Sequence, residues 1–166
     1  MNLAITLTSS LIGSLARAGD LASVAGNISN IKEFRFREGG GLNQASLVFT
    51  DTRTLAASTS EDLDLAGGLT DPFGATLAFT KIKAIRILAA LANVNDVQVG
   101  GAAANAFVGP FGASTHKLAI PPGGMIELVN PTAAGWTVTA ATGDLLKIAN
   151  SAAGSSVTYD IILLGA

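Results

Sequence analysis

GGMIELVNPTAAGWTVTAATGDLLKIANSAAGSSVTYDIILLG, residues 123–165, is the stretch that decides the fold class. Its apolar and polar residues alternate, most clearly in 136–139 (WTVT) and 157–160 (VTYD). A period of two is typical of β-strands with one buried face. Turn residues separate the runs, as in 142–144 (TGD). Short strands at this spacing predict an all-β, antiparallel sandwich or barrel. The expected strands are 125–129, 136–140, 145–149 and 156–164.

The preceding part of the chain continues the β pattern. Residues 2–8 alternate as a strand, and 31–38 (IKEFRFRE) form a second, with phenylalanines on one face and charges on the other. A glycine-rich turn at 39–43 predicts a hairpin into a strand at 45–50. Residues 76–92 are the longest apolar run and predict a central strand. We expect Arg86 within it to reach solvent or to pair with a carboxylate.

Residues 9–30 allow two interpretations. Leu11, Leu15 and Ala18 have helical spacing, but three glycines in the segment each weaken a helix by about 1 kcal/mol relative to alanine. The segment is therefore expected to be a loop with one helical turn, or else a peripheral arm that lies on a neighbour. We expect one domain overall, with an N-terminal strand and arm at 1–30 and a β-sandwich at 31–166.

The composition favours self-association. Charged residues make up 13% of the 166 residues, about half the ~25% that is usual for a soluble protein. Apolar residues make up 49%, and there are 19 glycines. A weakly charged chain has little repulsion to keep its copies apart. We expect a homo-oligomer, with a trimer preferred and a dimer as the alternative.

Charge and motifs argue against several classes of protein. The net charge is −2 and the basic residues are scattered, so no nucleic-acid partner is expected. The chain has no cysteine, hence no disulfide and no thiolate metal site. The start of the chain lacks the basic segment of a secretory signal, and no run approaches the ~18 apolar residues of a membrane span. We expect synthesis in the cytoplasm and no membrane partner.

Candidate catalytic or metal-binding residues are few. Asp62 and Asp64 alternate with leucines, so they form either a calcium or acid–base pair or, as we favour, a solvated strand face. His116 is the single histidine, and no nucleophile elbow or phosphate-binding loop accompanies it. We therefore expect no enzyme activity, no cofactor and no metal site.

The segment 100–114 (GGAAANAFVGPFGAS) is a glycine- and alanine-rich loop with Phe107 and Phe111 as its large aromatic side chains. Loops of this length are usually functional or mobile. The two aromatics either fold back onto the core or anchor a contact with another chain, and both alternatives stay open. We take Phe107 and Phe111 as the candidate interface residues.

More than half of the chain resembles a known group of proteins. The stretches are 51–88 (DTRTLAASTSEDLDLAGGLTDPFGATLAFTKIKAIRIL), 93–107 (NVNDVQVGGAAANAF) and 121–165, which begins PPGGMIELVNPTAAGWTV. They are similar to small virion structural proteins of tailed bacteriophages.

The resemblance implies a jelly-roll-like β-sandwich that acts as a capsid cement or decoration protein. Its partner would be the major capsid protein, whose neighbouring subunits it would bridge, and its location the capsid surface of the virion. The alternative is a receptor- or carbohydrate-binding β-sandwich on a phage tail or fibre. The one Trp and the one Tyr both fall on expected core faces, which disfavours a sugar site.

Overall fold

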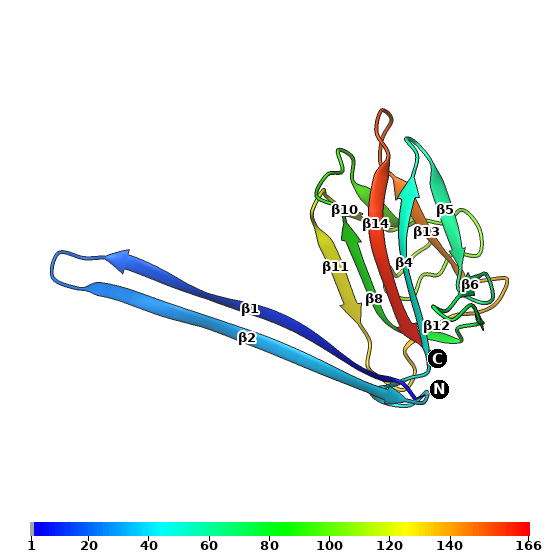
Figure 1. Ribbon diagram of the computed structural model, residues 1–166, viewed down its shortest axis with the longest axis horizontal. Helices are drawn as coiled ribbons and strands as arrows, with labels where there is room; N and C mark the ends of the chain where they lie inside the picture. The colour runs from blue at the N-terminus through cyan, green and yellow to red at the C-terminus, as the bar shows by residue number, and fades with distance from the viewer. Residues whose placement is uncertain (1) are drawn as a thin grey trace.

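The computed structural model describes residues 2–166, and all its regular elements in that range are β-strands (Figure 1). One sheet has the order β11 (Met125–Val129), β8 (Lys81–Ala89), β14 (Val157–Gly165), β4 (Leu47–Leu55), and β12 (Trp136–Thr137) also pairs with β8. We call it the β8 sheet. The second, the β9 sheet, has the order β10 (Lys117–Ile120), β9 (Val97–Gly100), β13 (Leu145–Asn150), β5 (Ser60–Asp64). No helix in residues 2–166 is long and apolar enough to cross a membrane.

The pairing of the eight sandwich strands is nested. The first strand, β4, pairs with the last, β14, and the second, β5, pairs with the second-last, β13. The third, β8, pairs with β11, and the innermost pair is β9 with β10. Every one of these pairs is antiparallel. This is the connectivity of a jelly roll, in which a long antiparallel ribbon rolls up into two four-stranded sheets.

The core lies between the two sheets. In β14 the alternate residues Val157, Tyr159, Ile161 and Leu163 are fully buried, whereas Asp160 on the other face is exposed. Central strands such as β8 and β14 have neighbours on both sides, so their inward residues are covered completely. The expected alternation is thereby confirmed as a one-sided burial pattern in β13 and β14, whereas the strand expected at 136–140 is shortened to β12.

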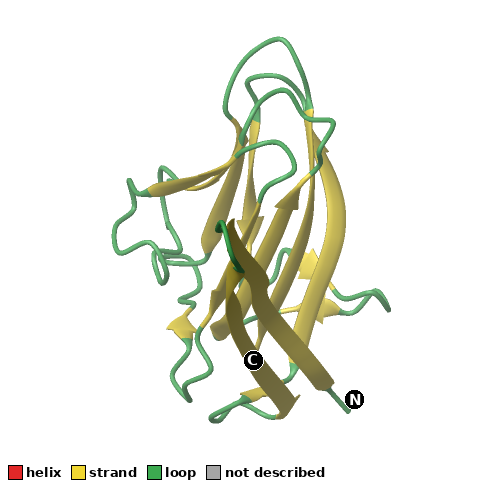
Figure 2. Ribbon diagram, turned by 90° about the vertical axis from the view of Figure 1, so that its left-hand side faces the viewer, coloured by secondary structure: helices red, strands yellow, loops and turns green. Residues whose placement is uncertain are grey.

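A hairpin arm precedes the sandwich. It consists of β1 (Ala4–Ala18) and β2 (Ser23–Glu38), joined by the turn 19–22. The arm leaves the sandwich near the chain termini and projects away from it (Figure 1). Figure 2, which looks from the side of the arm's tip, shows the ribbon crossing in front of the sandwich. The short β3 (Gln44–Ala45) pairs in parallel with the end of β2, and β6 (Leu69–Thr70) pairs with β7 (Thr76–Leu77).

The N-terminal part of the chain differs from the sequence-based expectations in three respects. The hairpin expected between 31–38 and 45–50 is wrong, because β2 pairs with β1 and β4 pairs with β14. The helical turn expected within 9–30 is wrong as well, because β1 and β2 extend through that segment. The boundary between residues 30 and 31 falls inside the continuous strand β2.

The run 76–92 is interrupted. The central strand β8 covers only Lys81–Ala89, and Leu91 lies in a turn with 84% of its surface exposed. Arg86 on this strand pairs with Glu127 of β11 at 3.4 Å, in agreement with the expected carboxylate partner. The strands expected at 125–129, 145–149 and 156–164 agree with β11, β13 and β14 to within one residue at each end.

Candidate functional site

The arm formed by β1 and β2 lies outside the sandwich and contributes no residue to the main core between the two sheets. Its strands pair without interruption from Ala4 opposite Arg37 to Ala18 opposite Ser23. At ~3.3 Å per residue, this ribbon is about 50 Å long. Only its root contacts the sandwich, so most of its length has no neighbour among residues 2–166 (Figure 1).

The arm has an apolar face. Residues directly opposite one another in an antiparallel pair lie on the same face, so the odd-numbered residues of β1 share a face with the even-numbered residues of β2. Near the root this face carries Ile5, Leu7, Phe34 and Phe36. Towards the tip it carries Leu11, Leu15, Val24 and Ile28, which we call the distal apolar residues.

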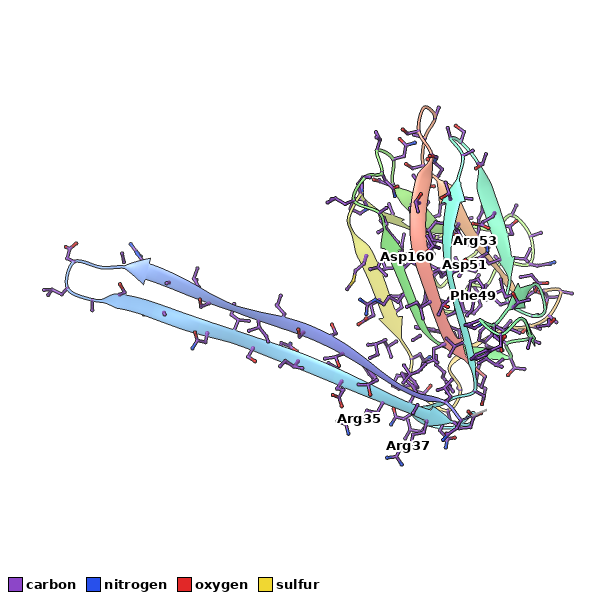
Figure 3. All side chains as sticks on the ribbon, viewed as in Figure 1. Arg35, Arg37, Phe49, Asp51, Arg53 and Asp160 are labelled. Carbon is purple, nitrogen blue, oxygen red and sulfur yellow. The ribbon has the colours of Figure 1, made fainter. Side chains whose placement is uncertain are left out.

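The opposite face is mainly polar. It carries hydroxyl side chains from both strands and charged side chains from β2, together with several alanines and the two larger apolar residues Ile12 and Ile31. Arg35 and Arg37 lie on it, and Figure 3 shows both pointing away from the sandwich. The arm is therefore an amphipathic ribbon with apolar residues at its packed root and towards its exposed tip, and the two sets are separated on the same face by Ser9 opposite Lys32.

The root of the arm packs on the outer face of the β8 sheet. Phe36 is 1% exposed, and together with Leu3 it joins Ala84 of β8 and Leu164 of β14 in a small second core. This second core is separate from the main core between the sheets. Because the root residues are alternate residues on two strands, burying them sets which face of the ribbon is turned towards the sandwich.

Two lysines hold the loops at the root. Lys81 and Lys83 are both on β8, and each donates hydrogen bonds to one carbonyl of 39–43 and one of 130–135. The acceptors are Gly40 and Ala133 for Lys81, and Gly41 and Thr132 for Lys83. Lys83 is fully buried, and burial, with the neighbouring charge of Lys81, lowers its pKa. These bonds tie the chain that leaves β2 to the sandwich, which stabilises the direction of the arm.

An apolar groove lies beside the root. Its volume is about 540 Å³, and its walls come from 2–5, 46–48, 71–73 and 75–77. Phe73 stands at the groove with 82% of its surface exposed. Asp71 is its one charged lining residue, and its Oδ1 accepts hydrogen bonds from the amides of Phe73 (2.9 Å) and Ala75 (2.8 Å). Oδ2 has no hydrogen-bond partner within residues 2–166.

A polar network occupies the open side of the sandwich, between β4 and β5. Arg53 pairs with Asp51 at 2.8 Å and with Glu61 at 2.6 Å, and the buried Tyr159 hydroxyl donates to Glu61 at 2.6 Å. The hydrogen bond to Glu61 raises the pKa of Arg53. Burial, and then the hydrogen bond to Glu61, raise the pKa of Tyr159. Figure 3 shows Asp51 and Arg53 on β4, with Asp160 on the adjacent β14.

The charged and hydroxyl groups of this network bond to one another. Both carboxylate oxygens of Glu61 are taken, one by Tyr159 and one by Arg53. A general base needs an oxygen within reach of a substrate proton, and both Glu61 oxygens already accept hydrogen bonds from side chains of this protein. The network links β4, β5 and β14 at the edge of the sandwich.

The sequence-based candidates for chemistry lie at opposite edges of the β9 sheet, with Asp62 and Asp64 on β5 and His116 next to β10. Asp62 is exposed on β5, and Asp64 accepts a hydrogen bond from the Ala66 amide at 2.8 Å, while Leu63 is buried on the other face. His116 is exposed and bonds the Phe111 carbonyl at 2.6 Å. Within residues 2–166, no three His, Cys, Asp or Glu side chains gather where they could hold a metal ion.

Phe107 and Phe111 lie against the chain's own core. Phe107 is 2% exposed and belongs to the main core, and Phe111 packs partly buried against it. The amide of Phe107 also bonds the Leu145 carbonyl at 2.9 Å, which fixes this part of the loop to β13. The burial of Phe107 favours the core alternative for that residue, whereas Phe111 keeps part of its surface exposed.

The sequence predicted the arm only as the second of two alternatives for residues 9–30, after a loop with one helical turn. The available signal was the alternation of Leu11, Gly13 and Leu15 with serines and Ile12, mirrored by Val24, Gly26 and Ile28 in the second strand. Leucine at positions 11 and 15 also fits a helical period, so the pattern was ambiguous. The groove was not predictable, because its walls come from four separate segments.

Comparison of the chain with protein-family models, with curated proteins and with solved structures finds no match in any of the three. The function therefore has to be argued from the residues and the geometry.

Proposed function

We propose that this protein is a structural subunit of a larger assembly, a capsid cement or decoration protein that bridges neighbouring major capsid subunits of a tailed phage. The observation that carries the proposal is the projecting arm. A compact β-sandwich presents one rigid body, and the arm adds a ribbon of about 50 Å with an apolar face whose distal part packs on nothing else among residues 2–166.

The arm is unusually apolar for an exposed element. Seven of the fifteen exposed large hydrophobic side chains of residues 2–166 lie within 4–38, although this segment is only about a fifth of the chain. An isolated two-stranded hairpin is marginally stable in water at best. Four of the seven, Leu11, Leu15, Val24 and Ile28, share one face, and an exposed apolar patch marks an interaction site. An arm of this design becomes stable when another subunit covers it, which is what a clamp between subunits requires.

The total surface supports the same reading. The chain exposes 9041 Å², whereas a compact monomer of its mass exposes about 7,600 Å² by the usual scaling of surface with mass. The excess, roughly 1,400 Å², is more than the ~800 Å² that one partner contributes to a specific interface of standard size.

The polar chemistry is consistent with a non-catalytic role. The strongest charge cluster, Arg53 with Asp51 and Glu61, is internally paired. Fold alone does not select a function, since jelly rolls serve many, and the resemblance of residues 51–88, 93–107 and 121–165 to phage head proteins supports the capsid role. The alternative, a carbohydrate-binding tail protein, is less favoured because Tyr159 is buried and Trp136 packs partly buried against the core.

The test is to locate the protein in the particle. Particles from the phage that encodes this chain are purified, their proteins are identified by mass spectrometry, and the particle is imaged by cryo-electron microscopy. We expect jelly-roll density over the junctions between capsid subunits, with a hairpin reaching to a neighbour. Absence from purified particles, or density confined to the tail or fibre, contradicts the capsid role.

A further inference from the structure

The distal half of the arm and the apolar groove are complementary surfaces that one chain cannot bring together. The groove adjoins the arm's own root, since Leu3 and Ile5 line it. The distal apolar residues lie further along the same ribbon, which projects away from the sandwich (Figure 1). A strand pair with an uninterrupted ladder does not fold back on itself, so the tip cannot reach the groove of its own chain.

Their side-chain chemistry matches. The distal apolar face presents Leu15 at 76% exposure and Val24 at 72%, and the groove presents Phe73 at 82%. The one charged residue on that part of the arm's apolar face is Arg17, opposite Val24. The one charged residue of the groove is Asp71, whose Oδ2 has no partner within residues 2–166. Arg17 makes no ion pair within the same residues.

We propose that the distal arm of one copy docks in the apolar groove of a second copy of this chain, with Arg17 paired to Asp71 of that copy. This rests on the proposed assembly role and names a partner for the arm. The root supports the geometry, because the same face of the ribbon already packs on the β8 sheet through Ile5, Leu7 and Phe36. The docked tip would extend this packing from the chain's own sandwich to a neighbour's.

The contact joins two different surfaces. Two copies that dock into each other reciprocally form a dimer, and copies that dock in cyclic order form a closed ring such as a trimer. Both outcomes use the same arm and groove, so the measured stoichiometry selects the symmetry and leaves the contact unchanged.

The first measurement is self-association of the purified full chain by sedimentation velocity. Leu15→Asp on the arm and Phe73→Ser in the groove should each raise the dissociation constant about tenfold or more. Each has a matched control. Ser14→Asp adds the same charge to the opposite face of the same strand, and Leu91→Ser removes a similarly exposed apolar side chain, 84% exposed, from another turn. Both controls should stay within about twofold of the wild type.

Mixing is the decisive experiment. Leu15→Asp chains keep an intact groove, and Phe73→Ser chains keep an intact arm, so a mixture has one functional contact per pair. The mixture should associate where neither variant does alone, and circular dichroism should show both variants folded. Failure of mixing to restore association overturns the proposal, as does a wild-type chain that remains monomeric at about 100 μM.

A charge test adds the ion pair. Arg17→Gln and Asp71→Asn each remove one charge, and the asparagine keeps the Oδ1 acceptor of the turn at 71–75. If the two residues meet, the double variant should be no weaker than the weaker single variant, because the second change removes nothing further. Independent effects that multiply contradict the Arg17–Asp71 pairing.

These outcomes are separate from those of the capsid proposal. A chain that self-associates through arm and groove, but is absent from particles, refutes the capsid role alone. A chain that binds capsids through its arm while it stays monomeric in solution refutes the arm–groove contact alone.

Discussion

The arm and the sandwich use the same local pattern with opposite results. In β14 the alternate apolar residues Val157, Ile161 and Leu163 are fully buried, whereas Leu11 and Leu15 of the arm are 68% and 76% exposed. Both segments are β-strands with a period of two. The difference is what lies above the apolar face, which is a second sheet in one case and solvent in the other. A strand pattern therefore predicts a face to be covered, without saying which chain covers it.

The largest effect on stability is expected in the main core of the sandwich. Phe107→Ala should lower the free energy of unfolding by about 3–5 kcal/mol, because the side chain is 2% exposed and its removal leaves a cavity between the sheets. Chemical denaturation of the purified chain measures this loss. Phe73→Ala, at an 82% exposed position, is the control and should change stability by less than about 0.5 kcal/mol. If Phe107→Ala and the wild type are equally stable, the result contradicts a core role for Phe107 and favours an interface role.

The second test is made at the root of the arm, where the arm packs on the sandwich. Phe36→Ala should cost about 3 kcal/mol or somewhat less, because the root core is small and its partly buried members can relax into the gap. Hydrogen exchange should show the amides of β1 and β2 losing protection more than those of β14. Phe36→Leu, which keeps most of the apolar volume, is the matched control. Uniform loss of protection across the whole chain would argue against a separately anchored arm.

The polar edge of the sandwich gives a smaller effect that depends on pH. Tyr159→Phe removes the hydrogen bond to Glu61 and should cost about 1–2 kcal/mol near neutral pH. Since burial raises the pKa of Tyr159 above the ordinary value of 10.0, the wild type gains this stability below pH 10 and loses it as the pH rises further. The stability difference between wild type and variant should therefore shrink above pH 10. A difference that grows there would reverse the assigned direction of the shift.

The smallest effect is expected on the distal arm. Leu11→Ala combined with Leu15→Ala should change the stability of the dilute, unassociated chain by less than about 0.5 kcal/mol, because both side chains are exposed. Thermal unfolding at low protein concentration measures this. The same double variant should matter at high concentration, where association covers the arm. A large loss of stability in the dilute chain would show that the arm is already covered by its own sandwich.

The sequence by itself determined the fold class and most of the sandwich strands. Residues 123–165 predicted strands that agree with β11, β13 and β14, because polar and apolar residues alternate between turn residues. A period of two gives a helix no continuous apolar face. It also indicated that Asp62 and Asp64 face solvent, since alternation alone separates them from Leu63 and Leu65. These are local properties, and local sequence is sufficient for them.

Only the tertiary structure decided how the strands pair and what the exposed faces meet. The expected hairpin of 31–38 with 45–50 was plausible locally, but β2 gains a longer partner in β1, and β4 gains β14, which lies about a hundred residues further along the chain. The sequence left two alternatives for Phe107, and only the packing of the loop shows that its side chain lies in the main core. The groove beside the root joins four separate segments. Strand pairing and groove formation depend on contacts between residues that are far apart in the sequence. The alternation of apolar and polar residues within one strand does not specify those contacts.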